Sequence, residues 1–343
     1  MIVRVSASML NLFIMATLFV GFSPSAGAKT TASATLAASN SQAEHVILVV
    51  FEGVGQDSVK GGAMPVLSRL VKDGSVTWSA TGVNPPLRLP AMASLLTGLP
   101  VEKHGITWNA FDFLRGYPRP PTLFDYLDLS GGKDSAIFFM DEAMYQLAKP
   151  EPYTDYQMCG PMKPECSPAT VVNYIRDYFR KATSGHGYGH AILALPHFLV
   201  VHLPEPARAG AAHGWNSKDY RDALRTVDGA IGSILGMYKE LGLLSRTTVM
   251  VTALSGTSET KPSGNGHQLN GELPRVPWIA SGAGIKSGHV IRQPVSILDT
   301  GATVMRILGL ETHTEWESHP VEEIFRAPRA ARVDRDEPAG KEP

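Results

Sequence analysis

Uninterrupted apolar runs alternate with segments of helical spacing along most of the chain. The runs at 46–51, 198–203 and 247–253 are apolar at nearly every position, as in strands buried on both faces of a parallel sheet. Further strands are predicted at 76–81, 135–139 and 276–280, and helices at 64–71, 90–96, 168–181, 217–241 and 297–308. The alternation predicts an α/β fold with a mostly parallel sheet that helices cover on both sides, a three-layer αβα sandwich.

The amino-terminal residues have the pattern of a secretory signal peptide. Arg4 precedes an apolar run at 9–22, and Ala26-Gly27-Ala28 supplies small residues for cleavage. A membrane anchor is the alternative, but a spanning helix needs about 20 apolar residues and this run is shorter. We therefore expect residues 1–28 to be removed, the mature protein to have no membrane span, and its location to be periplasmic or secreted.

Composition divides the remaining chain into three parts. Residues 29–44 are rich in Ala, Ser and Thr and are predicted to form a disordered linker. Residues 45–326 are long enough for one large domain with a substantial core. Residues 327–343 are proline-rich and charged, and we expect a disordered tail.

Charge and cysteine content indicate which partners and which cross-links to expect. Lysine plus arginine (31) nearly balances aspartate plus glutamate (32), so bulk charge does not favour a nucleic-acid partner. Cys159 and Cys166 lie close together and are predicted to form a disulfide in an oxidising compartment. A two-cysteine metal site is the alternative, although structural zinc takes four ligands and no second pair lies nearby.

Candidate chemistry collects where parallel strands end. In an open parallel sheet, reactive groups lie in the loops beyond the carboxyl ends of the strands. Glu52 follows the first strand, a loop at 204–213 follows the strand at 198–203, and another loop follows Ala253. We expect these three segments to line one cleft.

At these strand ends the chain resembles the alkaline phosphatase superfamily, most closely its type I phosphodiesterase and nucleotide pyrophosphatase branch. The resemblance covers nearly the whole mature chain. It is carried by ordered motifs that read FEGVG, LPAMASLLTGLPVEKHGITWN, VVHLPEPARAGAAHGWNS, VTALSG, GHQLNGELPRVPWIASGAGIKSG and SILDTGATVMRILGL. The resemblance implies an alkaline-phosphatase-like fold and two-metal hydrolysis, in which two zinc ions orient a phosphate ester and activate a serine or threonine nucleophile.

Most positions that the resemblance assigns to this chemistry hold other residues. Glu52 occupies the position of the strand-end aspartate. Arg88, which has no attacking oxygen, occupies the position of the nucleophile. His267 alone matches the last ligand histidine. The other ligand positions have lost the family residue: they are Ala207, Ala211, Leu254 and Ser255. Glu52 and His267 are thus remnants of two sites that each needed at least three protein ligands, and no metal cofactor is expected.

Four neighbouring side chains are candidate substitutes. His202 and His213 lie near the lost ligands, but we expect surface or supporting roles for them, because family members carry histidines there beside the true ligands. Ser94 and Thr97 are candidate replacement nucleophiles, but they lie inside the helix predicted at 90–96 or at its end, where packing is the simpler role.

The charged residues that remain suggest a binding pocket. We hypothesise that Arg88 pairs with Glu52 and fills the first metal position, since an unpaired buried carboxylate is costly; the alternative is that Arg88 turns outward to solvent. Asn109 matches an asparagine that contacts phosphate in this branch, although it could instead cap a turn. Arg88, Asn109, Glu52 and His267 are the predicted ligand-binding residues, for a phosphorylated or sulfated group.

The sequence therefore favours an exported pseudoenzyme that binds an anionic small molecule or a protein partner. The alternative is a residual phosphoric or sulfuric ester hydrolase that uses Glu52 and His267. A structural role in the cell envelope that does not use the cleft is a third possibility.

Overall fold

The computed structural model describes residues 43–327, apart from 131, 148–153, 159–166, 185–193 and 257–272. All of these belong to one unit, residues 38–343. The predicted signal peptide, Cys159, Cys166 and His267 lie outside the described residues.

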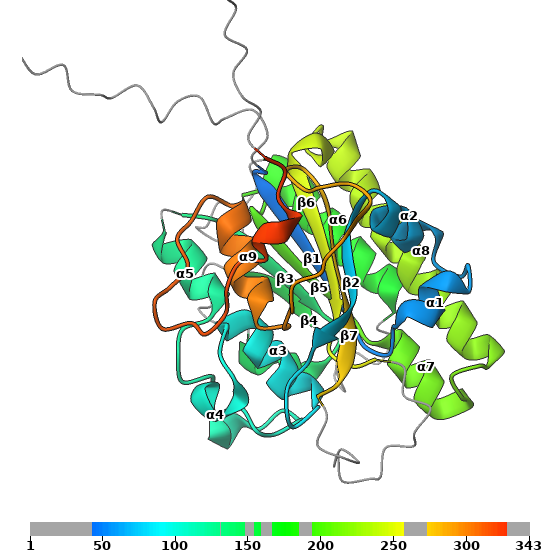
Figure 1. The fold of residues 1–343 in the computed structure, drawn as a ribbon, viewed down its shortest axis with the longest axis horizontal. Helices are drawn as coiled ribbons and strands as arrows, with labels where there is room; N and C mark the ends of the chain where they lie inside the picture. The colour runs from blue at the N-terminus through cyan, green and yellow to red at the C-terminus, as the bar shows by residue number, and fades with distance from the viewer. Residues whose placement is uncertain are drawn as a thin grey trace, which may run out of the picture. The chain divides into compact units, whose positions relative to one another are not determined.

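A mixed sheet forms the centre of this unit (Figure 1). Its strand order is β4-β3-β5-β1-β6-β7-β2-β8, and among the strands of the described segments only β7 runs against the others. The strands are β1 (His45–Phe51), β2 (Gly74–Thr81), β3 (Ser135–Phe139), β4 (Thr154–Met158), β5 (Phe198–Leu203), β6 (Thr247–Ala253), β7 (Arg275–Gly282) and β8 (His289–Val290). The predicted mostly parallel sheet is confirmed.

Helices cover both faces of the sheet. α2 and α6 pack against α8, and α7 also contacts α8, on one face; α3 packs against α5 and α9 on the other (Figure 1). The helices are α1 (Gln56–Lys60), α2 (Pro65–Lys72), α3 (Arg88–Thr97), α4 (Val101–His104), α5 (Leu123–Leu129), α6 (Pro168–Thr183), α7 (Glu205–His213), α8 (Lys218–Glu240) and α9 (Asp299–Ile307). The α/β three-layer prediction therefore holds.

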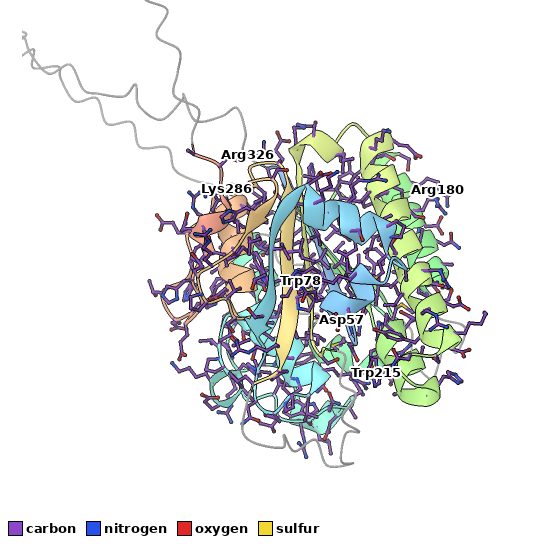
Figure 2. All side chains as sticks on the ribbon, turned by 45° about the vertical axis from the view of Figure 1, so that its right-hand side comes forward. Asp57, Trp78, Arg180, Trp215, Lys286 and Arg326 are labelled. Carbon is purple, nitrogen blue, oxygen red and sulfur yellow. The ribbon has the colours of Figure 1, made fainter. Side chains whose placement is uncertain are left out.

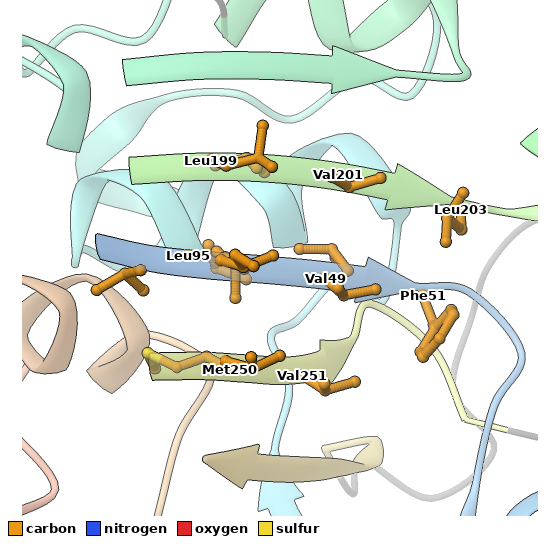
Figure 3. Close-up of a cluster of buried hydrophobic side chains, with 14 of the residues drawn as sticks. Val49, Phe51, Leu95, Leu199, Val201, Leu203, Met250 and Val251 are labelled. Carbon is orange, nitrogen blue, oxygen red and sulfur yellow. The ribbon is translucent and has the colours of Figure 1, made fainter. Parts of the chain in front are cut away.

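The core lies on β1, which is buried along its whole length between β5 and β6. Figure 3 shows Val49 of β1 between Val201 of β5 and Val251 of β6, with Leu95 of α3 alongside. Each fully buried aliphatic side chain of this kind stabilises the fold by roughly 1.5–3 kcal/mol relative to an exposed one. This packing holds the carboxyl ends of the three strands side by side.

Two predicted boundaries were wrong. The segment 204–213 was predicted as a loop, but Glu205–His213 forms α7, because Pro206 suits the first helical turn and the alanines that follow favour helix. Helix α3 begins at Arg88 rather than Pro90, since the first backbone N–H groups of a helix have no internal partner and a proline is tolerated anywhere in that turn.

Candidate functional site

The turn after β1, the start of α7 and the turn after β6 meet at one edge of the sheet. The backbone N–H of Ala207 donates to the Glu52 carbonyl at 3.1 Å, and that of Gly53 donates to the Ser255 carbonyl at 3.0 Å and to its hydroxyl oxygen at 3.2 Å. Ala207 is thus joined to Glu52, and Ser255 to the next residue, by single backbone hydrogen bonds. The three strand-end segments that were expected to line one cleft are brought together by these contacts.

Gly53 makes this close approach sterically allowed. Its φ is +72°, and a Cβ atom here would lie 2.7 Å from the Cα of Ala207. Only glycine takes this backbone conformation without a side-chain penalty. The Tyr220 hydroxyl of α8 also donates to the Gly53 carbonyl at 2.8 Å, so two helices fix the turn that presents Glu52.

Glu52 pairs with His202 and not with Arg88. His202 Nε2 lies 2.8 Å from Glu52 Oε1, and His202 is fully buried. The predicted Arg88–Glu52 ion pair was wrong, because β5 lies beside β1 in the sheet and places an imidazole at the carboxylate. His202, expected to be a surface or supporting histidine, is the buried partner of Glu52, while its Nδ1 has no hydrogen-bond partner among the described residues.

Arg88 instead pairs with Asp141, which follows the end of β3. Arg88 Nη2 lies 3.0 Å from Asp141 Oδ2, and the other carboxylate oxygen, Oδ1, accepts from the backbone N–H of Ala143 at 2.8 Å. The Asp141 side chain is 9% exposed and that of Arg88 is 35% exposed. A carboxylate near the amino terminus of α3 compensates a cation that is unfavourable there. The position expected for a nucleophile is therefore filled by one half of an ion pair.

Asn109 caps helix α3. Its Oδ1 accepts from the backbone N–H of Leu89 at 3.0 Å, and its own carbonyl accepts from Arg88 Nη2 at 3.4 Å. The residue at the helical N-cap, Leu87, has no side-chain acceptor, so a residue distant in the sequence supplies this function. The sequence left open that Asn109 caps a turn, and in the structure it caps the first turn of α3. The phosphate contact stays a prediction.

Ser94 is not a replacement nucleophile. Ser94 and His104 are fully buried, and Ser94 Oγ lies 2.9 Å from His104 Nε2. His104 Nδ1 accepts from the backbone N–H of Ile106 at 3.1 Å, so the proton sits on Nε2 and faces the serine. Burial lowers the pKa of His104 to about 4. An imidazole that already holds a proton on Nε2 does not take the serine proton, and Ser94 serves packing as predicted.

Glu205, at the start of α7, carries the most perturbed carboxyl group of the cleft. Burial raises its pKa to about 7, while its own backbone N–H group, Arg208 and His202 lower it and Glu52 raises it. Both carboxyl oxygens are buried, and no other described residue hydrogen-bonds to either. Sequence reasoning missed this residue, as it missed Asp141, although both follow strand ends and the strand-end rule was sufficient to find them.

The residues at the positions that the resemblance assigns to metal ligands do not fit two zinc ions. Leu254 is 1% exposed and packs in the core, and the alanines at 207 and 211 have no donor atoms. Ser255 Oγ accepts from Gly53, and Glu52 Oε1 is bound to His202. Within the part of the chain that the structure describes, no three His, Cys, Asp or Glu side chains are grouped so as to hold a metal ion.

Comparisons with known proteins place this geometry in context. A family model described as type I phosphodiesterase / nucleotide pyrophosphatase matches residues 46–307. The ectonucleotide pyrophosphatase/phosphodiesterase family member 1 of Homo sapiens is 28% identical over 195 residues, which cover 53% of this chain and 20% of the relative. The chain thus spans about a fifth of that relative's length.

Solved structures show the same fold. Murine ectonucleotide pyrophosphatase/phosphodiesterase 5 superposes with a TM-score of 0.60 at 15% identity, covering 82% of this chain and 100% of that one. BT4656, solved in complex with its substrate D-glucosamine-2-N,6-O-disulfate, gives a TM-score of 0.62 at 14% identity, covering 84% and 81%. At these identities the likeness concerns the fold.

Proposed function

Because the chain belongs to the type I phosphodiesterase / nucleotide pyrophosphatase family of the alkaline phosphatase superfamily, we propose that it is a pseudoenzyme of that family. In this proposal its cleft binds an anionic ligand and does not hydrolyse it by the two-metal route. One observation carries the proposal: the nucleophile position holds Arg88, whose guanidinium is fixed by Asp141.

The electrostatics of the cleft support this reading. In the family reaction, cations neutralise a phosphate ester and a hydroxyl attacks it. Here Glu52 is bound by an imidazole and Arg88 by a carboxylate, so both groups are engaged in contacts that use no metal. A guanidinium at the edge of a cleft still binds phosphate or sulfate oxygens well, because its N–H groups match their geometry.

We further propose that the protein is exported. The support is the amino-terminal pattern of a charged residue, an apolar run and small residues at 26–28. No helix among the described residues has the length and apolar character needed to cross a bilayer. Cell fractionation and amino-terminal sequencing of the mature protein test this proposal; an uncleaved protein in the cytoplasmic fraction contradicts it.

Metal content and hydrolysis test the pseudoenzyme proposal directly. We expect purified protein to carry no stoichiometric zinc and to leave a nitrophenyl phosphodiester uncleaved with zinc added. Restoring a hydroxyl by Arg88→Thr should give no activity either, because the ligand positions at 207, 211, 254 and 255 stay unfilled. Stoichiometric zinc together with chelator-sensitive cleavage by the unmodified protein contradicts the proposal.

Thermal unfolding tests ligand binding. Inorganic phosphate, sulfate and AMP are added in turn, and a ligand at 100 times its Kd stabilises the folded state by about 2.7 kcal/mol. We expect at least one of these anions to raise the unfolding midpoint by several degrees. A midpoint that none of them moves contradicts anion binding and leaves a protein partner as the ligand. In that case a pull-down comparing the unmodified protein with Arg88→Ala tests whether the partner uses the cleft.

Residual hydrolysis is the second candidate. It was predicted to use Glu52 and His267, and His267 lies outside the described residues. The observation that favours it is Glu205, since a pKa near 7 suits a general base. Cleavage of a nitrophenyl ester that resists chelators and is lost in Glu205→Gln would support this candidate; an inactive unmodified protein excludes it.

A further inference from the structure

The two arginines at the cleft differ in how their charge is balanced. Arg88 lies 3.0 Å from the Asp141 carboxylate. Arg208 of α7 donates from Nη2 to the neutral carbonyl of Met140 at 2.7 Å. Its nearest carboxyl oxygen is Oε1 of Glu205, at 3.9 Å from Nη1, and neither carboxyl oxygen of Glu205 accepts a hydrogen bond from another described residue. Arg208 is therefore anchored by a neutral group and its charge is not matched by a hydrogen-bonded anion.

The charge on Glu205 itself is weak near neutral pH. Burial raises the pKa of this carboxyl group to about 7, so a substantial share of it is protonated there. Arg88 has the Asp141 side chain at 3.0 Å, whereas Arg208 has at 3.9 Å a carboxyl group that is partly neutral. Protonation of Glu205 thus adds to the difference that the contacts show: the charge of Arg208 is balanced less well than that of Arg88.

The two guanidiniums approach the same edge of the sheet from opposite faces. Figure 1 shows α3 and α7 on opposite sides of the sheet, toward the same end. Their arginines are held by Met140 and Asp141, which are consecutive residues whose Cα atoms are about 3.8 Å apart. An anion bound by Arg208 therefore lies beside the Met140–Asp141 segment that also holds Arg88.

The two arginines also differ in accessibility. Nε of Arg88 is buried and has no partner among the described residues, and its Nη2 is occupied by Asp141 and Asn109. The Arg208 side chain is 49% exposed, and only its Nη2 is used by a hydrogen bond that the structure shows. Nη2 has two N–H groups and Met140 takes one of them, so one edge of the Arg208 guanidinium, either Nη1 with Nη2 or Nε with Nη2, remains available for a bidentate contact with an oxyanion.

We propose that Arg208 is the ligand-binding cation of the cleft and that it takes the oxyanion head of a phosphate or sulfate ester, while Arg88 serves to hold the α3 terminus against Asp141. This inference rests on the proposed anion binding and deepens it. Sequence reasoning assigned the ligand to Arg88, because that residue stands at the nucleophile position. The contacts reassign it to Arg208, whose nearest carboxyl oxygen, that of Glu205, lies at 3.9 Å, whereas Asp141 lies 3.0 Å from Arg88.

Isothermal titration with inorganic phosphate, sulfate and AMP tests the assignment and separates phosphate from sulfate recognition. Arg208→Ala and Arg208→Gln should each weaken binding at least tenfold; the glutamine variant keeps an N–H donor for Met140 and so guards against misfolding. Arg208→Lys keeps the charge but loses the planar guanidinium, so its affinity should lie between that of these two variants and that of the unmodified protein. The double variant Arg88→Ala/Asp141→Ala removes the ion pair as a unit and should weaken binding less than either Arg208 variant does.

Arg180→Ala is the matched control. Arg180 is an exposed helical arginine that pairs with Asp177, and Figure 2 shows it at the opposite end of the helical layer from Trp215, which follows α7. Its removal should leave the affinity unchanged.

The possible results separate the two proposals. If the double variant abolishes binding and both Arg208 variants keep it, this inference is overturned and anion binding in the cleft stands. If the unmodified protein binds an anion that no variant at 88, 141 or 208 affects, the binding site lies elsewhere, and this inference and the proposed cleft site both fail. If the unmodified protein binds none of the three anions, the proposed anion binding fails, and the assignment of Arg208 fails with it.

Discussion

Replacing Glu205 with glutamine should stabilise the protein at alkaline pH. The side chain is mostly buried, both of its oxygens lack hydrogen-bond partners among the described residues, and burial raises its pKa from 4.5 to about 7. The folded protein therefore binds this proton more tightly than the unfolded chain does. Stability from this group is fully present below pH 4.5 and is lost as the pH rises through about 7.

The size of the effect follows from the two pKa values of Glu205. A difference between 4.5 and about 7 corresponds to about 3 kcal/mol of unfolding free energy, at about 1.4 kcal/mol for each tenfold change in proton affinity. Most of this develops between pH 5 and pH 8. Relative to the unmodified protein, Glu205→Gln should thus gain about 2.5 kcal/mol between these two pH values.

Urea denaturation followed by tryptophan fluorescence at pH 5 and pH 8 measures this gain. The contacts that the glutamine amide makes or loses contribute equally at both pH values, so the change with pH isolates the buried carboxyl group. Glu240→Gln, at the exposed end of α8, is the control and should show no such change. A Glu205→Gln difference that is the same at pH 5 and pH 8 would refute the reasoning.

Three further substitutions test the supports of the cleft. Asn109→Ala should lower the unfolding free energy measured in urea by about 1 kcal/mol, because it removes the cap of α3. Asn109→Asp keeps an acceptor and should cost less. Equal losses in the two variants would argue against the cap. Gln146→Ala should lower hydrogen-exchange protection in segment 108–116, because its buried amide accepts from and donates to that segment; unchanged protection contradicts this role. Gly53→Ala should lower the unfolding temperature of the protein far more than Gly62→Ala does. Both glycines have positive φ, but of the two only Gly53 has backbone atoms within 3 Å of an added Cβ. Similar losses in the two variants would show that the close approach is unimportant.

The fold could be predicted because its signals are local. The apolar runs of β1, β5 and β6 identify buried parallel strands, and their predicted bounds agree with the structure to within one residue. Ser167 and Ser217 begin α6 and α8 as N-caps that accept from backbone N–H groups three residues on. The loop prediction for α7 failed because it considered only the place of the segment after a strand end, while the alanines and the packing of Trp215 on Gly210 favour a helix.

The site could be predicted only in part, for a physical reason. The strand-end rule brings Glu52, Ala207 and Ser255 together without any knowledge of side-chain contacts. The pairing of charges depends on which strands are neighbours and on how far each side chain reaches. Asp141 follows β3, which is not adjacent to β1 in the sheet. The sequence around Arg88 and Glu52 therefore does not reveal that Arg88 binds Asp141 and that Glu52 binds His202.

The Arg88–Asp141 pair also limits which residues position 88 accepts. Replacing Arg88 with serine or threonine would leave the mostly buried Asp141 carboxylate without its cation, and an uncompensated buried charge destabilises the fold. A hydroxyl at position 88 therefore costs stability unless position 141 changes as well. The two positions thus form one unit for substitution.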